Sequence, residues 1–168
     1  MPDLTEIVHS LRSSGFRELS GARASATVPV AESLLNSITA ATLPPHAPVR
    51  AVTVHPGDGD RLSVRIIAKA ALIPPITLKL AIESQPVLPD SPVLGLRMVT
   101  LGGLFGLASG AIAGMLPPGV TLQGERILVD LAALARQRGH GEVFNYLEHL
   151  EVHTSAGRLV VRLDVGVR

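Results

Sequence analysis

The chain has no cysteine and no tryptophan, and one tyrosine and three phenylalanines are its only aromatic residues. Without cysteine there are no disulfides, no thiol catalysis and no cysteine metal ligands. With so few rings, stacking of nucleic-acid bases on aromatic side chains has little support. The core must instead be aliphatic, since hydrophobic residues make up 46% of the 168 positions.

Charge is also scarce, at 17% of the sequence against about 25% in ordinary soluble domains. Fifteen basic and fourteen acidic residues give a formal net charge of +1, which supplies no general attraction to nucleic acid. The positive mean hydropathy, +0.37, favours a chain that contacts lipid or encloses an apolar cavity.

The length fits a single domain over residues 1–168, with an N-terminal amphipathic helix in 1–15 and a body in 19–168. Acidic residues stand at positions 3 and 6, where a secretory signal would be positively charged. We therefore expect a cytoplasmic protein, with membrane association as the alternative.

Most of the body has the two-residue period of half-buried β-strands. The alternation predicts strands near 22–30, 49–55, 62–69, 76–83 and 92–99, one strand-like piece at 121–129, and a C-terminal hairpin turning at 155–157. Helical spacing predicts short helices at 31–38 and 131–138. The expected fold class is α+β, a curved antiparallel β-sheet wrapped around a long apolar glycine-rich helix, with one or two additional short helices.

The glycine-rich helix is expected in the segment 98–116, which contains no charged residue. Its glycines recur at every fourth position, at Gly102, Gly106, Gly110 and Gly114, and would form one groove along a helix. Glycine costs about 1 kcal/mol relative to alanine inside a helix, so we interpret the groove as a place of close approach by another backbone. The opposite side of this helix would present Leu104, Phe105, Leu107, Ile112 and Met115.

Three interpretations of this segment compete. Its length and small-xxx-small pattern are compatible with a transmembrane span. Its Gly-Leu-Phe-Gly at 103–106, followed by Ala-Ile-Ala-Gly at 111–114, is similar to the start of viral fusion peptides, which suggests an interfacial helix. We favour a buried helix, because each predicted strand has an apolar face that must be covered.

The order of these elements resembles the tubular lipid-binding superfamily, which includes the bactericidal/permeability-increasing protein. The similarity spans residues 19–168 and is one of pattern: SATVPVAESLLN at 25–36, a strand meander, LPPGV at 116–120, and a terminal strand pair ending GRLVV at 157–161. In that family a highly curved antiparallel sheet wraps a long helix, and acyl chains lie between them. This chain departs from the pattern in three ways: it has no cysteine for lipidation, we expect no export signal, and its glycine-rich helix is expected to be shorter than the long helix of that family.

The resemblance implies non-catalytic binding of lipid or another hydrophobic ligand in an aliphatic cavity between sheet and helix. The implied ligand-facing residues are Leu34, Leu35, Ile38, Leu104, Phe105, Leu107, Ile112 and Met115. The alternative is a structural or interaction protein whose segment 98–116 docks into a partner, a second copy of the chain or a membrane. In neither case do we expect nucleic acid as a partner.

Catalytic and metal-binding patterns are weak. Ser109 lacks the first glycine of a G-x-S-x-G elbow, so we interpret it as a helix-packing residue. His149, Glu151 and His153 share one face of a predicted strand and would suit a metal, but alternating polar residues are expected on any exposed strand face. Asp58 and Asp60 lack the glutamate that closes a calcium loop and fit a hairpin turn. We therefore expect no enzyme activity, cofactor or metal.

Overall fold

The structure is a computed structural model, and it describes residues 13–14, 19–43, 45–99, 113–114 and 116–167. In chain order the elements are β1 (Arg23–Ala31), α2 (Glu32–Thr42), β2 (Val49–Pro56), β3 (Arg61–Ala68), β4 (Ile76–Ser84), β5 (Val93–Met98), β6 (Val120–Gln123), β7 (Arg126–Asp130), α4 (Leu131–Gln137), the 3-10 helix η2 (Gly141–Asn145), β8 (Leu147–Ser155) and β9 (Arg158–Gly166). The fold is α+β, and every pair of these strands is antiparallel.

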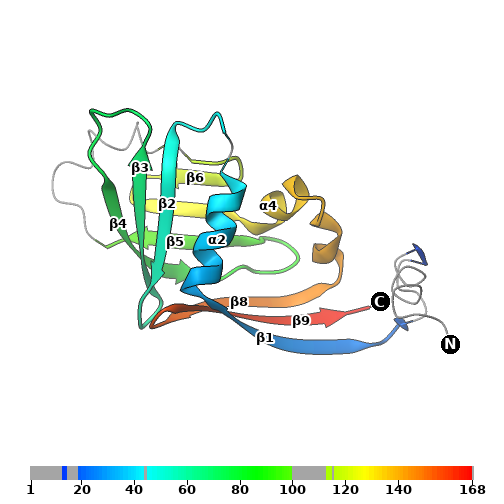
Figure 1. Ribbon diagram of the computed structural model, residues 1–168. Coiled ribbons are helices and arrows are strands. Elements are labelled where there is room, and N and C mark those ends of the chain that lie inside the picture. The colour runs from blue at the N-terminus through cyan, green and yellow to red at the C-terminus, as the bar shows by residue number, and fades with distance from the viewer. Residues whose placement is uncertain (1–12, 15–18, 44, 100–112, 115, 168) are drawn as a thin grey trace.

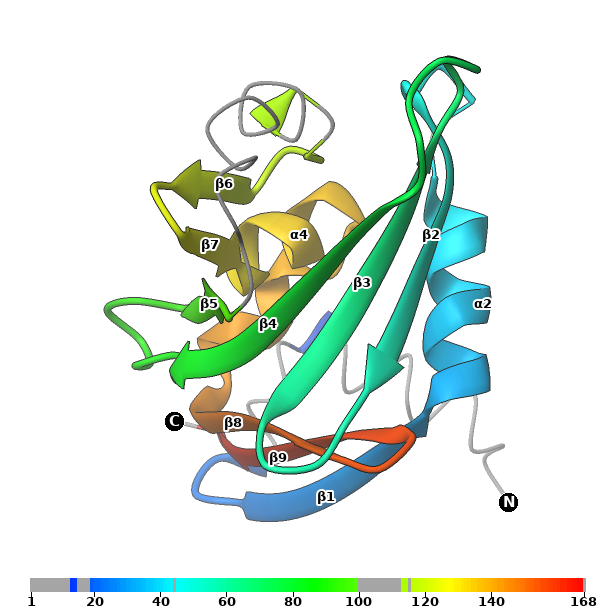
Figure 2. The same cartoon turned by 90° about the vertical axis from the view of Figure 1, so that its left-hand side faces the viewer.

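The larger sheet has six strands in the order β2-β3-β4-β5-β7-β6 and curls into a half-barrel (Figure 2). Its first hairpin turns at 56–60, the segment expected to form a turn from its glycines and aspartates. Gly59 and Asp60 both adopt positive φ there, 67° and 58°, a conformation that glycine and aspartate tolerate better than most residues.

The core lies against the inner face of this half-barrel. The two-residue period places Leu78 and Leu80 of β4 on that face, where they are 2% and 3% exposed. The other buried members of this aliphatic cluster are Val49, Ile66, Leu94, Leu96, Met98, Ile127 and Val152. No aromatic residue is among them, as the composition predicted.

The smaller sheet has three strands in the order β1-β9-β8, and β1 leads directly into α2, which lies beside β2 (Figure 1). The predicted C-terminal hairpin is confirmed, with Leu150 and Val152 buried on one face. β1 is also confirmed, but eight of its nine residues are exposed.

The two sheets meet where the β2–β3 turn touches the β8–β9 hairpin. Asp60 Oδ1 accepts a hydrogen bond from the backbone N–H of Thr154 at 2.9 Å. The neighbouring Asp58 Oδ1 accepts one from the N–H of Ala156 at 2.8 Å, and the N–H of Gly157 donates to the carbonyl of Pro56 at 2.9 Å. The aspartates that fitted a hairpin turn in the sequence therefore also join the two sheets.

Stability should depend on the charge of Asp60. The hydrogen bond from the Thr154 backbone and the nearby His153 hold the pKa of Asp60 below its usual range. A carboxylate whose pKa is lowered in the folded state stabilises the fold. This contribution is complete above about pH 4, near the pKa of aspartate in the unfolded chain, and it is lost as the pH falls through the folded-state pKa. We expect Asp60→Asn, which keeps an acceptor oxygen, to lower the free energy of unfolding by about 1 kcal/mol at pH 7, the side chain being partly exposed.

Urea denaturation of both proteins at pH 7 and pH 3 measures this difference. It should shrink at the lower pH, because the wild-type carboxylate is then increasingly protonated. Asp90→Asn, in an exposed turn, is the matched control and should leave the difference near zero. An undiminished effect of Asp60→Asn at pH 3 would contradict a role for the charge.

Two expectations from the sequence are corrected. The piece at 121–129 is a hairpin of two strands, β6 and β7, because Gly124 takes a φ of 59° and turns the chain. The sheet does not wrap a long apolar helix in the described part of the chain, where α2 and α4 are short, at 11 and 7 residues.

The expected glycine-rich helix falls largely outside the described residues, which exclude 100–112 and 115. Its expected first residue, Met98, instead ends β5, where pairing with β4 holds it in extended conformation. The predicted N-terminal helix also lies outside the described residues, apart from Ser13 and Ser14. None of the helices that the structure describes is long and apolar enough to cross a membrane.

Candidate functional site: a cationic patch on the outer face of the half-barrel

Three cationic side chains lie together on the outer face of the larger sheet. Leu62 and Ile66 of β3 face the core, so the alternation places Arg61 and Arg65 on the opposite face. Lys79 of β4 is outward by the same argument, and all three residues are exposed. We call Arg61, Arg65 and Lys79 the cationic patch.

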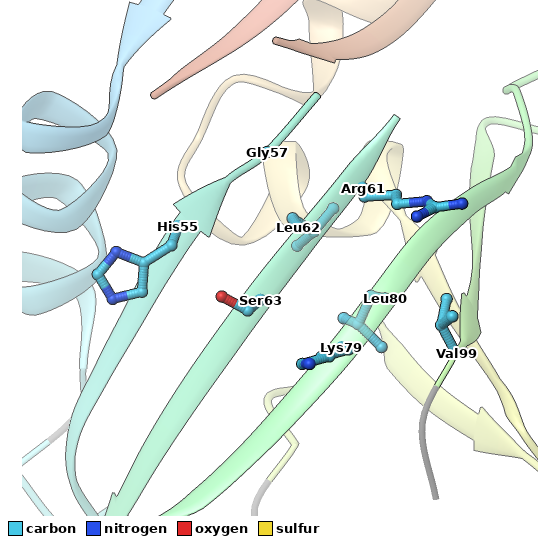
Figure 3. A pocket seen from close by; sticks show the side chains of 8 residues that line it. All are labelled: His55, Gly57, Arg61, Leu62, Ser63, Lys79, Leu80 and Val99. Atoms are coloured by element: carbon cyan, nitrogen blue, oxygen red, sulfur yellow. The ribbon is translucent and has the colours of Figure 1, made fainter. Parts of the chain in front are cut away.

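The register of the hairpins brings the three residues of the patch around one position. Ser63 of β3 pairs with Lys79 of β4 on one side and with His55 of β2 on the other. Arg61 and Arg65 are each two residues from Ser63, which places them about 7–8 Å diagonally from Lys79. Figure 3 shows His55, Ser63 and Lys79 on adjacent strands, with Arg61 nearer the turn.

The patch has no counter-ion in the described part of the chain. None of Arg61, Arg65 and Lys79 forms an ion pair with a described acidic residue. Other cations of this sheet are neutralised: Glu83 pairs with both Arg97, at 3.7 Å, and Arg126, at 2.8 Å. Like charges this close repel one another, and a bound anion would remove that repulsion.

An open depression of about 240 Å³ lies over part of the patch (Figure 3). Its lining consists of His55, Gly57, Arg61, Leu62, Ser63, Lys79, Leu80 and Val99. Val99 supplies an apolar wall and is 45% exposed, and its N–H donates to the carbonyl of Lys79 at 2.7 Å. The depression therefore combines positive charge, a hydroxyl group and an apolar margin, and it is smaller than the pockets that enclose drug-sized ligands.

Ser63 is not arranged as a nucleophile despite its neighbours. His55 Nδ1 lies 2.7 Å from Glu32 Oε1, and the ring extends toward α2 in Figure 3. No hydrogen bond joins Ser63 Oγ to His55 among the described contacts, and that contact is what activates a serine hydroxyl. The hydroxyl is thus suited to donating a hydrogen bond to a ligand.

A second depression, of about 280 Å³, lies beside the C-terminal end of α2. It is lined by Ala40, Leu43, Pro45, Val49, Arg50, Ala51, Val52 and Lys69. Lys69 Nζ donates to the carbonyl of Pro45, so one of its two cations already has a partner. It therefore offers less free charge than the cationic patch.

The ligand-facing residues expected from the sequence lie elsewhere. Leu34 and Ile38 of α2 are 53% and 42% exposed, Leu35 is partly buried, and none of the three lines either depression. Gly114 is an exposed turn residue. The remaining expected residues lie outside the described part of the chain: Gly102, Leu104, Phe105, Gly106, Leu107, Gly110, Ile112 and Met115.

The structure does bring His149, Glu151 and His153 together on β8. Glu151 Oε1 lies 3.1 Å from His149 Nε2, and Glu151 Oε2 lies 3.6 Å from His153 Nε2. The hydrogen bond from His149 lowers the pKa of Glu151. These side chains contact one another, and no group of three or more histidine, aspartate or glutamate side chains within the described ranges is arranged to hold a metal ion.

The cationic patch could not be predicted from the sequence. The two-residue period puts Arg61, Arg65 and Lys79 on the polar faces of their strands, but a single strand does not show which residues lie opposite on the next one. The signal was present in the spacing of Arg61 and Arg65, which puts both on one face, but the position of Lys79 depends on a register set by the whole 69–75 connection.

Comparison of the chain with protein-family models, with curated proteins and with solved structures finds no match. No relative therefore supplies residue roles. Among the described side chains, the cationic patch is the arrangement whose chemistry points most directly to a ligand, namely an anion.

Proposed function

We propose that this protein binds anionic lipid without catalysis, and that the cationic patch contacts the headgroup phosphates. The observation that carries the proposal is the placement of Arg61, Arg65 and Lys79 on one exposed face with no described counter-ion. The formal net charge of the whole chain is only +1, so this positive charge is local. A local patch suits a surface that presents several phosphates together.

Lipid is favoured over other anions by what adjoins the patch. Val99 forms the apolar wall of the depression, and it belongs to the uncharged segment 98–116. We propose that this segment supplies the apolar contact with acyl chains, through Leu104, Phe105, Leu107, Ile112 and Met115. Nucleic acid would need aromatic stacking or a wider basic surface, and the composition offers neither.

The size of the electrostatic term indicates that membrane binding needs both the charge of the cationic patch and the apolar contact. A basic residue near an anionic membrane surface contributes about 1 kcal/mol, so the three cations supply roughly 3 kcal/mol. That is too little for stable attachment alone, just as a single acyl anchor gives only reversible binding. The proposed site therefore lies on the outer face of the sheet at a membrane surface and not in a cavity between sheet and helix.

Vesicle co-sedimentation tests this function. Wild-type protein should pellet with vesicles of phosphatidylcholine and phosphatidylserine but far less with phosphatidylcholine alone, and added salt should weaken the binding. The triple variant Arg61→Gln, Arg65→Gln, Lys79→Gln should lose affinity on the order of 100-fold, as three interactions of about 1 kcal/mol predict.

The matched control changes three exposed arginines away from the patch, Arg138→Gln, Arg158→Gln and Arg162→Gln. It alters the net charge equally and should keep most of the binding. Equal losses in the two triple variants would show that only total charge matters and would contradict a site at the patch. Failure of the wild-type protein to bind the anionic vesicles would refute the proposed function.

A further inference from the structure

Three free strand edges, those of β2, β8 and β1, differ in what covers them. The first is the edge of β2. Its free edge is covered by Asn36 of α2, whose side-chain amide pairs with a strand backbone as another strand would. Asn36 Nδ2 donates to the carbonyl of Val54 at 3.0 Å, and Asn36 Oδ1 accepts from the N–H of Val54 at 2.7 Å. This edge is therefore closed to a further strand.

The free edge of β8 is closed in the same manner. The side-chain amide of Gln85 donates to the carbonyl of Val152 at 2.7 Å and accepts from its N–H at 2.9 Å. Asp60 and Asp58 accept the next outward N–H groups, those of Thr154 and Ala156. The side chains of Gln85, Asp60 and Asp58 thus bond to successive outward backbone groups along this edge.

The free edge of β1 has no such cover in the described part of the chain. The N–H of Val167 donates to the carbonyl of Ala22, and the N–H of Glu32 donates to the carbonyl of Gly157. Even-numbered residues therefore bond to β9, and the odd-numbered ones direct their N–H and C=O groups outward. No described strand or side chain bonds to that outward edge, and eight of the nine residues of β1 are exposed.

We propose that a second copy of this chain pairs with the open edge, β1 against β1 and antiparallel, about a two-fold axis at Ser25. The proposal is independent of lipid binding. Pro29 fixes the register, because it stands at an outward position and has no N–H to donate. A two-fold axis at Ser25 gives the longest overlap of the two β1 strands in which Pro29 lies beyond the end of the other copy's β1.

The strand is self-complementary in this register. Ser25 faces its own copy, and Arg23 faces Thr27 on both sides, so each of these facing pairs exchanges two N–H···O bonds. The side chains between them, Ala24 and Ala26, are small enough to lie beside each other without clash. The two Arg23 residues lie four positions apart along the paired strands. This separation of about 13 Å exceeds the Debye length at physiological salt, so their mutual repulsion is screened. The result is one six-stranded sheet continuous across two copies.

A single cysteine tests the register, because the natural chain contains none. Ser25→Cys would face its own copy at a Cα separation of about 5.5 Å, within the range that a disulfide spans. Mild oxidation should therefore convert the variant into a covalent dimer. Thr27→Cys is the matched control on the same edge, and its two thiols would lie about 13 Å apart along the strand direction and should not join. Cross-linking of Thr27→Cys in preference to Ser25→Cys would overturn the proposed pairing.

A proline tests the edge without disturbing β9. The N–H of Thr27 points outward, so Thr27→Pro removes a donor to the second copy and leaves the β1–β9 ladder intact. We expect analytical ultracentrifugation to show a dimer for the wild type and for Thr27→Val, which keeps the N–H, and at least a tenfold weaker dimer for Thr27→Pro. Circular dichroism checks that the proline variant is folded. A wild-type monomer at all concentrations, or an unweakened dimer of Thr27→Pro, would overturn the proposal.

Discussion

Replacing Leu78 with alanine should lower the free energy of unfolding by about 2–5 kcal/mol. Leu78 is 2% exposed and lies in the aliphatic cluster on the inner face of the half-barrel. Alanine would remove buried methyl groups and leave a cavity, since neighbouring strands held by backbone hydrogen bonds relax only in part. Urea denaturation monitored by circular dichroism measures the loss, which is a large share of the stability of a domain of this size.

Leu72→Ala is the matched control for this prediction. Leu72 is 97% exposed, so the same change in chemistry should alter the free energy of unfolding by less than about 0.5 kcal/mol. An equally small effect of Leu78→Ala would contradict a packed aliphatic core. It would favour the interior cavity that the resemblance to tubular lipid-binding proteins implied.

Replacing Gln85 with leucine should destabilise the protein on the order of 2–4 kcal/mol. The Gln85 amide satisfies both backbone groups of Val152, which is 5% exposed. Leucine satisfies neither group, and a buried backbone donor or acceptor without a partner costs about 1–3 kcal/mol. Urea denaturation gives the total effect, and hydrogen exchange at the Val152 amide should accelerate in the variant.

The control for the Gln85 variant is Gln123→Leu in β6, an exposed position where the side chain caps no strand edge. Its free energy of unfolding should change by less than about 0.5 kcal/mol. If the two leucine variants were equally stable, water would be satisfying Val152, and the capping of the β8 edge by Gln85 would be without energetic weight.

Much of the secondary structure could be predicted from the sequence, because strands with one buried face carry their period in the order of residues. Leu62, Val64 and Ile66 alternate with polar residues, and the structure places them in β3 with the apolar side inward. The hairpin turn at 56–60 followed equally from local chemistry, since glycine and aspartate tolerate the positive φ that it needs.

What could not be predicted depends on contacts between distant residues. Asn36 of α2 and Gln85, which follows β4, each cap a strand that only the tertiary fold brings near. The hairpin of β6 and β7 was also missed, because one strand-like piece was expected across 121–129 and the turn at Gly124 was not recognised. The cationic patch could not be predicted for the same reason, since it arises from the register between β3 and β4.

The pairing of β1 with β9 has a consequence for the order in which the protein folds. Arg23 pairs with Gly166, whereas the half-barrel uses only residues between 49 and 130. On the ribosome the half-barrel strands are therefore all synthesised before β9 exists, and they are free to assemble first. β1 must wait for a partner that arrives last, with both of its edges unpaired in the meantime. The long sequence separation of this closing step predicts that formation of the smaller sheet limits the rate of folding.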